Sequence, residues 1–166
     1  RISVAENEQM AIKILLNSLY GALGNRYFRF FDQRIAEAIT LSGQLTIRWA
    51  EVAINKYLNT ILKTDNKDYV IAIDTDSLYV TLDNLVKAVN PDDPINFMDK
   101  VSQDKLEPVL EKAYNQLYGL MGGIENRMVM KREAIADRAI WTAKKRYILN
   151  VHDNEGVRYS EPKLKI

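Results

Sequence analysis

Apolar positions recur along this chain with two different periods, and each period predicts a type of secondary structure. One helix is predicted around residues 13–21, where apolar residues return every three or four positions. The same spacing from 34 to 62 predicts a long helix with two apolar sides, as in a helix pressed between a sheet and another element. The candidates for burial are Ile35, Ile39, Leu45, Trp49, Val52 and Tyr57 on the first side, and Leu41, Ile47, Ile54 and Leu58 on the second.

A different pattern follows the long helix. Residues 69–73 and 78–82 are rich in β-branched, apolar and aromatic residues, and they enclose four polar residues, 74–77. Two strand-like runs around a short polar break predict a β-hairpin with residues 74–77 at its tip.

The second half of the chain is predicted to combine helix with short strands. A Pro-bearing loop at 90–94 precedes a helical region from about 95 to 120, which Pro108 should kink or divide. The β-like runs that follow are residues 128–135, 147–151 and 157–159, with a connecting loop at 136–140. Helices that cover one face of an antiparallel sheet define an α+β fold.

Composition fits a single folded unit without disulfides. The chain has 166 residues, 47% of them hydrophobic, and it contains no cysteine, which excludes disulfides and thiolate metal sites. No apolar run approaches the roughly 20 residues needed to cross a membrane, and the first residues lack the apolar segment of a signal peptide. We therefore expect a cytoplasmic protein with no membrane partner.

Charge is distributed unevenly along the chain. Residues 127–166 carry ten Lys or Arg against five Asp or Glu, whereas residues 1–126 carry thirteen against seventeen. A basic end of this kind favours nucleic-acid binding. His152 has no second histidine or cysteine near it in the sequence, so we expect a surface residue at a strand end rather than a metal ligand.

Asp74 and Asp76 place two carboxylates at the tip of the predicted hairpin. Side chains two apart in an extended segment project from the same face, and two crowded carboxylates repel one another unless a cation lies between them. Mg²⁺ typically takes one or two protein carboxylates together with substrate phosphates. The pair therefore indicates phosphoryl or nucleotidyl transfer; the alternative is that Asp and Ser simply favour a turn.

Lys13, Asn17 and Tyr20 lie at positions i, i+4 and i+7 of the first predicted helix, on one ridge. A cation, an amide and an aromatic ring on one ridge suit a nucleoside triphosphate, because they can serve its phosphates, its sugar and its base. The alternative is an amphipathic helix with a solvated lysine and a packed tyrosine.

A run of cations between aromatic residues lies near the basic end. Lys144, Lys145 and Arg146 stand between Trp141 and Tyr147. Cations flanked by aromatics suit the neutralisation of phosphates together with sugar or minor-groove contacts. The alternative is a solvated strand.

The three motifs read K-x-x-x-N-S-x-Y-G, D-T-D-S and K-K-R-Y, and their order resembles that of the family B DNA polymerases. The sequence from Asn17 to Asn25 looks most like that of the replicative polymerases of T-even-type phages. The resemblance covers nearly the whole chain and implies a palm-type antiparallel sheet with long helices packed on one face. It assigns residues 1–24 to the last part of the fingers and residues 25–166 to the palm.

The resemblance also implies roles for residues of the first helix. Lys13 and Asn17 match residues that contact the incoming deoxynucleoside triphosphate (dNTP). Tyr20 and Gly21 match a pair that lies against the nascent base pair.

A metal site and a primer site are implied in the same way. Asp76 matches the carboxylate that binds both catalytic Mg²⁺ ions, and Asp74 and Glu133 match acidic neighbours of that site. The residues that match the primer-gripping motif are Lys144, Lys145, Arg146 and Tyr147.

Three departures from the family pattern affect loop contacts. Ile73 stands where the family usually has glycine, which removes backbone freedom before Asp74. Lys131 occupies a position that is commonly acidic in the phage relatives. The connection at 136–140 is much shorter than the Gly- and Pro-rich loop of the phage relatives.

The family pattern includes parts that this sequence does not contain, notably a second metal-binding aspartate from an upstream palm strand. We therefore expect a polymerase fragment, from a split gene or an excised piece, that pairs with a complementary fragment or self-associates. With that fragment it would transfer a nucleotide from a dNTP to a primer 3′-hydroxyl on primer–template DNA. The alternative is a catalytically silent module that binds nucleic acid or another replication protein. The host cytoplasm is the expected location if a phage encodes the chain.

Overall fold

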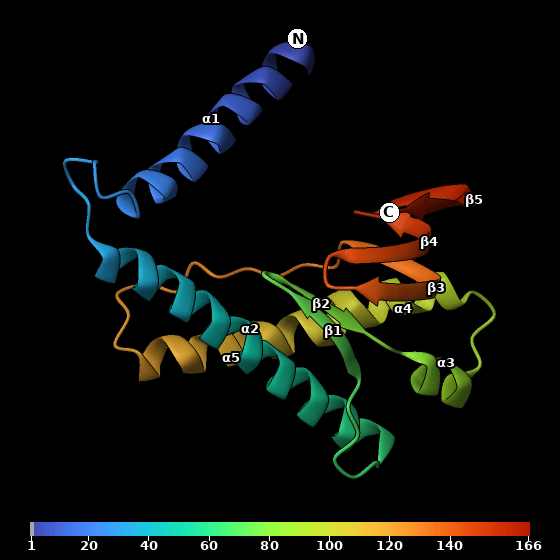
Figure 1. Cartoon of the computed structure of the whole chain (residues 1–166). Coiled ribbons are helices and arrows are strands. Elements are labelled where there is room, and N and C mark those ends of the chain that lie inside the picture. The colour runs from blue at the N-terminus through green and yellow to red at the C-terminus, as the bar shows by residue number, and fades with distance from the viewer. Residues whose placement is uncertain (1) are drawn as a thin grey trace. The chain divides into compact units, whose positions relative to one another are not determined.

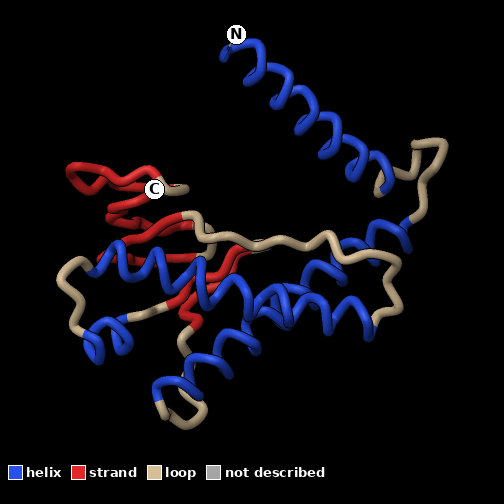
Figure 2. The backbone as a smooth tube through the Cα atoms, turned by 180° about the vertical axis from the view of Figure 1, so that it is seen from behind, coloured by secondary structure: helices blue, strands red, loops and turns tan. Residues whose placement is uncertain are grey.

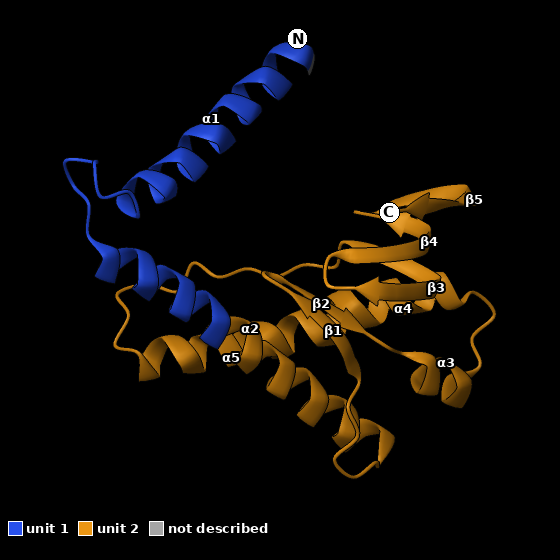
Figure 3. Ribbon diagram, in the orientation of Figure 1, with its two compact units in different colours: residues 1–45 blue, residues 46–166 orange. Residues whose placement is uncertain are grey.

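The structure is a computed structural model that describes residues 2–166. These residues form helices and antiparallel strands joined by loops (Figure 1). Arg1, the first residue of the predicted fingers segment, lies outside the described residues. The chain divides into two compact units, residues 1–45 and residues 46–166 (Figure 3). The elements in chain order are α1 (Ile2–Leu23), α2 (Gln33–Leu62), β1 (Val70–Asp74), β2 (Ser77–Val80), α3 (Asp83–Val89), α4 (Pro94–Val101), the π-helical segment η1 (Ser102–Leu106), α5 (Glu107–Leu120), β3 (Ala134–Ala143), β4 (Arg146–Asn154) and β5 (Val157–Lys165).

The first unit consists of α1, a short loop and the beginning of α2. The predicted helix is confirmed and is longer than the motif that indicated it. Its apolar stripe is exposed: Leu15 and Leu16 are 68% and 62% accessible to solvent. Contiguous exposed apolar side chains are a feature of interaction surfaces. Pairing with another polypeptide or self-association stays a prediction.

The second apolar side of α2 forms the core of the second unit. Ile47, Ala50, Ile54 and Leu58 are buried, each at most 7% exposed. The expected burial of the first side is wrong for Ile35, Ile39, Leu45 and Val52, which are 40–65% exposed, and Leu41 of the second side is exposed as well. The physical reason is packing, because Ala50, Ile54 and Leu58 belong to one hydrophobic cluster with residues of η1 and α5.

One hydrophobic cluster joins α2 to η1, α5 and the start of β1. Its buried members are Ala50, Ile54, Leu58, Tyr69, Val70, Leu106, Leu110 and Tyr114. Residues of the β1–β2 hairpin, including Ile73, Leu78 and Val80, pack against it. Full burial of a Leu or Ile side chain contributes roughly 1.5–3 kcal/mol. The hairpin is therefore packed against a base formed by α2, η1 and α5.

Two asparagines of α2 fix where β1 begins. The side-chain oxygen of Asn55 accepts hydrogen bonds from the backbone N–H groups of Tyr69 (2.8 Å) and Val70 (3.3 Å). The Asn59 amide donates to the carbonyl oxygen of Lys67 at 2.7 Å and accepts from its N–H at 2.9 Å. The segment before the hairpin is thus tied to the helix by polar contacts as well as by apolar packing.

Helical structure runs from Pro94 to Leu120 through α4, η1 and α5 (Figure 2). Asp93 caps its start, because its carboxylate accepts from the N–H groups of Ile95 and Asn96, both at 3.1 Å. Pro108 has no N–H and its ring excludes the carbonyl four residues earlier, and the turn before it widens to the π-helical η1. The predicted division at Pro108 is confirmed in this form. The short helix α3 was not predicted.

The basic end folds into an antiparallel sheet with the order β3-β4-β5. The runs predicted at 147–151 and 157–159 lie within β4 and β5. The prediction of a strand at 128–135 is wrong for residues 128–133, because side chains take the place of a strand partner there. Met128 N–H donates to Asn126 Oδ1 (3.0 Å), and Arg132 N–H donates to Glu107 Oε1 (3.2 Å). The expected loop at 136–140 is also wrong, since these residues belong to β3.

The α+β class is confirmed, although the strands form two small sheets, β1-β2 and β3-β4-β5, rather than a single sheet. The assignment to a palm-type sheet stays a prediction. Within residues 2–166, none of the helices combines the length and the apolar character needed to span a membrane.

Candidate functional site

The tip of the β1–β2 hairpin carries both predicted metal-binding aspartates. Asp74 ends β1 opposite Ser77, and Thr75 adopts a left-handed conformation with φ of 45°. The turn is closed by the Asp76 N–H, which donates to the Asp74 carbonyl oxygen at 2.5 Å, and by the Ser77 hydroxyl, which donates to the same oxygen at 3.1 Å. This local geometry follows from the polar four-residue break between two apolar strands.

The two aspartates differ in their surroundings. Asp74 is half-buried, and its Oδ1 accepts a hydrogen bond from the Thr75 hydroxyl at 3.1 Å. Asp76 is exposed, and among residues 2–166 its carboxylate has no hydrogen-bond or ion-pair partner. A free carboxylate beside a second one offers oxygen ligands of the kind that Mg²⁺ prefers.

These ligands fit a hard cation, but they form only part of a coordination shell. The described residues contain no group of three or more His, Cys, Asp or Glu side chains placed to hold a metal ion. Glu133 therefore does not complete such a group with Asp74 and Asp76. Further ligands would come from water, from substrate phosphates or from other polypeptide, as is usual for Mg²⁺.

The predicted primer-gripping residues lie at the tip of a second hairpin. Lys144 and Lys145 form the turn between β3 and β4, and Lys145 has a positive φ of 60°. Arg146 opens β4 opposite Ala143. All three cations are exposed, whereas Tyr147 is half-buried. The turn therefore presents adjacent positive charges to solvent.

The two hairpin tips meet through an ion pair. Lys145 Nζ lies 3.8 Å from Asp74 Oδ1, with 65% and 30% of the respective side chains exposed. The structure thus brings a residue of the primer motif together with a residue of the carboxylate motif, although 70 positions separate them in the sequence. Sequence analysis assigned these residues to one site only through the family resemblance.

Three aromatic side chains of the two hairpins contact one another. Trp141 and Tyr147 are cross-strand partners in β3 and β4. The Tyr79 ring of β2 contacts both, with ring centroids 5.2 Å and 5.6 Å away. Burial, followed by a hydrogen bond with Tyr147, raises the pKa of Tyr79 to about 12. Sequence analysis assigned no role to Tyr79 or Trp141; the available signal was that aromatics flank both polar breaks.

The predicted triphosphate-binding residues lie on α1, in the first unit. Lys13 and Asn17 are exposed, and the Tyr20 hydroxyl shares a hydrogen bond with the Thr40 hydroxyl at 2.8 Å. A Cβ placed on Gly21 would meet no atom within 4 Å, so the helix surface is open there. The three side chains therefore lie on an accessible surface of α1.

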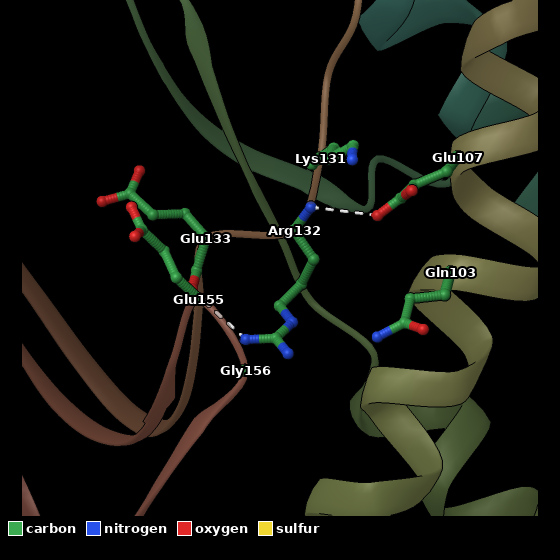
Figure 4. Close-up of a pocket in the computed structure, with 7 residues that line it drawn as sticks. All are labelled: Gln103, Glu107, Lys131, Arg132, Glu133, Glu155 and Gly156. Carbon is green, nitrogen blue, oxygen red and sulfur yellow. Dashed lines mark hydrogen bonds between the residues drawn. The ribbon is translucent and has the colours of Figure 1, made fainter.

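Glu133 lies in a different environment from the aspartates. Its carboxylate forms an ion pair with Lys165 of β5. It lines a groove of about 650 Å³ whose other walls are Gln103, Glu107, Lys131, Arg132, Glu155 and Gly156 (Figure 4). Lys131 is exposed in the same groove.

Arg132 is the anchor of this region, and sequence analysis missed it. Its side chain is 9% exposed, and its guanidinium group forms ion pairs with Asp99 of α4 and Asp153 of β4. Burial lowers the pKa of Arg132, but the hydrogen bonds with Asp99 and Asp153 together have the larger effect, so the pKa lies above its ordinary value. The Asp153 carboxylate also accepts from the Gly156 N–H at 3.0 Å. The clamp holds the three-stranded sheet to the helical base.

His152 lies within β4 rather than at a strand end. Its Nε2 is 3.3 Å from Asp137 Oδ1. Burial opposes ionisation of Asp137, but the hydrogen bond from Asn150 and the neighbouring His152 lower its pKa. This pair links β3 to β4 and contains no further metal ligand among the described residues.

Comparison with known proteins identifies relatives along the whole chain. The family described as DNA polymerase family B matches residues 1–160. The chain is 43% identical to the DNA-directed DNA polymerase of Enterobacteria phage T4 and 41% identical to that of Escherichia phage RB69, over 99% and 95% of its own length. It is also 34% identical to the DNA polymerase alpha catalytic subunit of Trypanosoma brucei brucei, over 54% of the chain and 6% of that protein. The matched regions cover 20% and 19% of the two phage proteins, so the chain spans about a fifth of their length.

Proposed function

The chain belongs to DNA polymerase family B, and on that premise we propose that it forms part of a DNA-directed DNA polymerase. The reaction is the attack of a primer 3′-hydroxyl on the α-phosphate of a dNTP, directed by a template strand. Residues 1–24 supply the end of the fingers and residues 25–166 part of the palm. The partners are primer–template DNA, a dNTP and further polymerase polypeptide, bound either as a complementary fragment or through self-association.

Asp76 is the principal metal ligand in this proposal, and Asp74 is its neighbour. The exposed and unpaired carboxylate of Asp76 supports this ranking, because it is available to a cation without breaking an existing contact. Two Mg²⁺ ions at such a site would stabilise charge on the attacking and leaving oxygens. In this proposal, Asp74 and Asp76 form only part of the coordination shell, and the second metal-binding aspartate of the family pattern would come from further polymerase polypeptide.

The other motifs bind and orient the substrates. Lys13 and Asn17 bind the triphosphate, and Tyr20 and Gly21 lie against the nascent base pair, for which the exposed ridge of α1 leaves room. The cations of the β3–β4 turn neutralise phosphates of the primer strand, and Tyr147 contacts its sugar.

The ion pair between Lys145 and Asp74 is the observation that carries the proposal. It joins the motif that binds primer phosphates to the motif that binds metal, at 3.8 Å. The 3′-hydroxyl sits on the sugar next to the last primer phosphate. A cation that holds this phosphate beside Asp74 therefore delivers the hydroxyl to the carboxylates.

Grafting tests the proposal without the need to know the rest of the native protein. The 166 residues replace the matching fifth of the phage T4 polymerase, and template-directed primer extension is measured with Mg²⁺. The expected result is extension by the chimera, a severe loss with Asp76→Asn and a smaller loss with Asp74→Asn. Equal extension by all three chimeras would contradict the proposed roles of the two aspartates.

A further inference from the structure

Tyr79 lies at the junction of the two hairpins. It projects from β2, and its ring contacts Trp141 at 5.2 Å and Tyr147 at 5.6 Å. We propose that Tyr79 and Trp141 are positioning residues that hold the Lys144–Lys145 turn beside Asp74. This inference rests on the proposed function, which gives the turn its role in primer binding.

The ion pair alone cannot fix the turn. Lys145 is 65% exposed, and exposed ion pairs contribute little because water screens them and the long side chain loses conformational freedom. Lys144 and Arg146 are exposed as well. The ring contacts are therefore the packed link between the β1–β2 hairpin and the β3–β4 turn.

The geometry of the rings makes this link directional. Tyr79 meets Trp141 edge to face at 77°, and it meets Tyr147 at 58°. Edge-to-face pairs contribute beyond the area they bury. Because Trp141 and Tyr147 face each other across β3 and β4, a ring placed against both sets the direction in which the turn points.

Packing, rather than hydrogen bonding, accounts for the role of Trp141. Its indole nitrogen is buried and has no hydrogen-bond partner among the described residues. A phenylalanine at this position would keep an aromatic edge without an unsatisfied N–H. The inference therefore predicts that Phe replaces Trp141 and Tyr79 with little loss, whereas Leu does not.

Spin labels measure the position of the turn in the absence of DNA. The chain contains no cysteine, so labels attach only at introduced Thr75→Cys and Lys144→Cys, the neighbours of Asp74 and Lys145. The expected result is strong dipolar broadening with Tyr79 or with Tyr79→Phe, and loss of that broadening with Tyr79→Leu or Trp141→Leu. Broadening that survives both leucine variants would overturn the inference. Tyr79→Leu and Trp141→Leu alter opposite sides of the same contact, so the test still holds if one of them misfolds. Circular dichroism shows whether each variant is folded.

A double-mutant cycle on duplex binding supplies the second readout. Lys145→Ala should reduce the slope of log K against log salt by about 0.9, the value for one lost phosphate contact. Tyr79→Leu should reduce it at least as much, and the double variant no further than Tyr79→Leu. Tyr159→Leu is the matched control, because this tyrosine stacks under Lys163 on β5 at 4.3 Å, away from the junction; its slope should equal that of the wild type.

The two readouts separate the two proposals. If Tyr79→Leu removes the broadening while Lys145→Ala leaves duplex binding unchanged, the positioning role is supported and the proposed primer contact is wrong. If Lys145→Ala weakens binding but the loss from Tyr79→Leu simply adds to it, the positioning role is overturned. A merely structural role for Tyr79 would lower the unfolding temperature and leave the salt slope intact.

Discussion

Replacement of Arg132 by methionine should cost the chain a large share of its stability. The substitution keeps much of the side-chain volume but removes the charge that joins Asp99 on α4 to Asp153 on β4. The Arg132 backbone N–H still donates to Glu107, so the segment before β3 stays attached to α5. The loss therefore reports the ion pairs themselves.

The size of the effect follows from burial. Removal of one partner from a buried ion pair costs about 3–5 kcal/mol, because it leaves an uncompensated charge. The Asp153 side chain is 9% exposed, so its unpaired carboxylate would carry the full desolvation cost. The Asp99 side chain is 27% exposed, so water can solvate its carboxylate once the ion pair is lost. We therefore expect the lower end, about 3 kcal/mol. At 2–4 °C per kcal/mol for chains of this size, the melting temperature should fall by about 6–12 °C.

Thermal unfolding followed by circular dichroism at pH 7 measures this difference. Arg127→Met is the matched control from the same unit, because Arg127 pairs with Glu125 at 2.7 Å but is 85% exposed; we expect a change of at most about 0.5 kcal/mol. Asp153→Asn in the Arg132→Met background should recover part of the loss by removing the buried charge. A melting temperature for Arg132→Met that matches the control would refute the reasoning.

Three further predictions concern the hairpin junction. Asp74→Asn should raise the affinity for primer–template duplex by at most about fivefold at low salt, because it releases Lys145 from an exposed ion pair that is worth about 0–1 kcal/mol. Asp76→Asn should raise this affinity less, and fluorescence anisotropy measures both. Replacement of Lys144, Lys145 and Arg146 together by alanine should flatten the slope of log K against log salt by about two units. Lys13→Ala should leave this slope unchanged. The pKa of Tyr79, raised from 10.0 to about 12 mainly by burial, exceeds its unfolded value, so its contribution to stability is complete below pH 10 and is lost as the pH rises towards 12. Urea titrations across this range should show a decline that Tyr79→Phe reduces; an identical decline in the variant would exclude Tyr79 as its source.

Local patterns predicted the elements that position the site. The hairpin follows from apolar runs around a polar break, and the helices follow from their period, because both signals lie within a few residues of one another. The change in helix type before Pro108 follows from the missing N–H. The motifs around Lys13, Asp74 and Lys144 were found in the same way, whereas Glu133 was assigned only through the family resemblance.

Long-range side-chain contacts account for what the sequence did not predict. Residues 128–130 form a short apolar run that resembles a strand, but side-chain oxygens of Asn126 and Glu107 accept from the N–H groups of Met128 and Arg132 in place of a neighbouring strand. The buried side of α2 is the one that shares a hydrophobic cluster with residues of η1 and α5, which are distant in the sequence. The contacts of Tyr79 and the clamp at Arg132 join residues distant in the sequence, and no local period encodes them.

The single-turnover rate of nucleotide addition tests the central claim, that Asp76 holds metal for nucleotidyl transfer, most directly. The measurement uses the phage T4 chimera with saturating dNTP and Mg²⁺, and it compares the wild-type segment with Asp76→Asn. Because a metal ion stabilises the transition state by several kcal/mol and each 1.36 kcal/mol is tenfold, we predict a rate reduced by at least about 10²–10³-fold, with primer–template affinity within about twofold. A rate for Asp76→Asn equal to that of the wild-type segment would contradict the account.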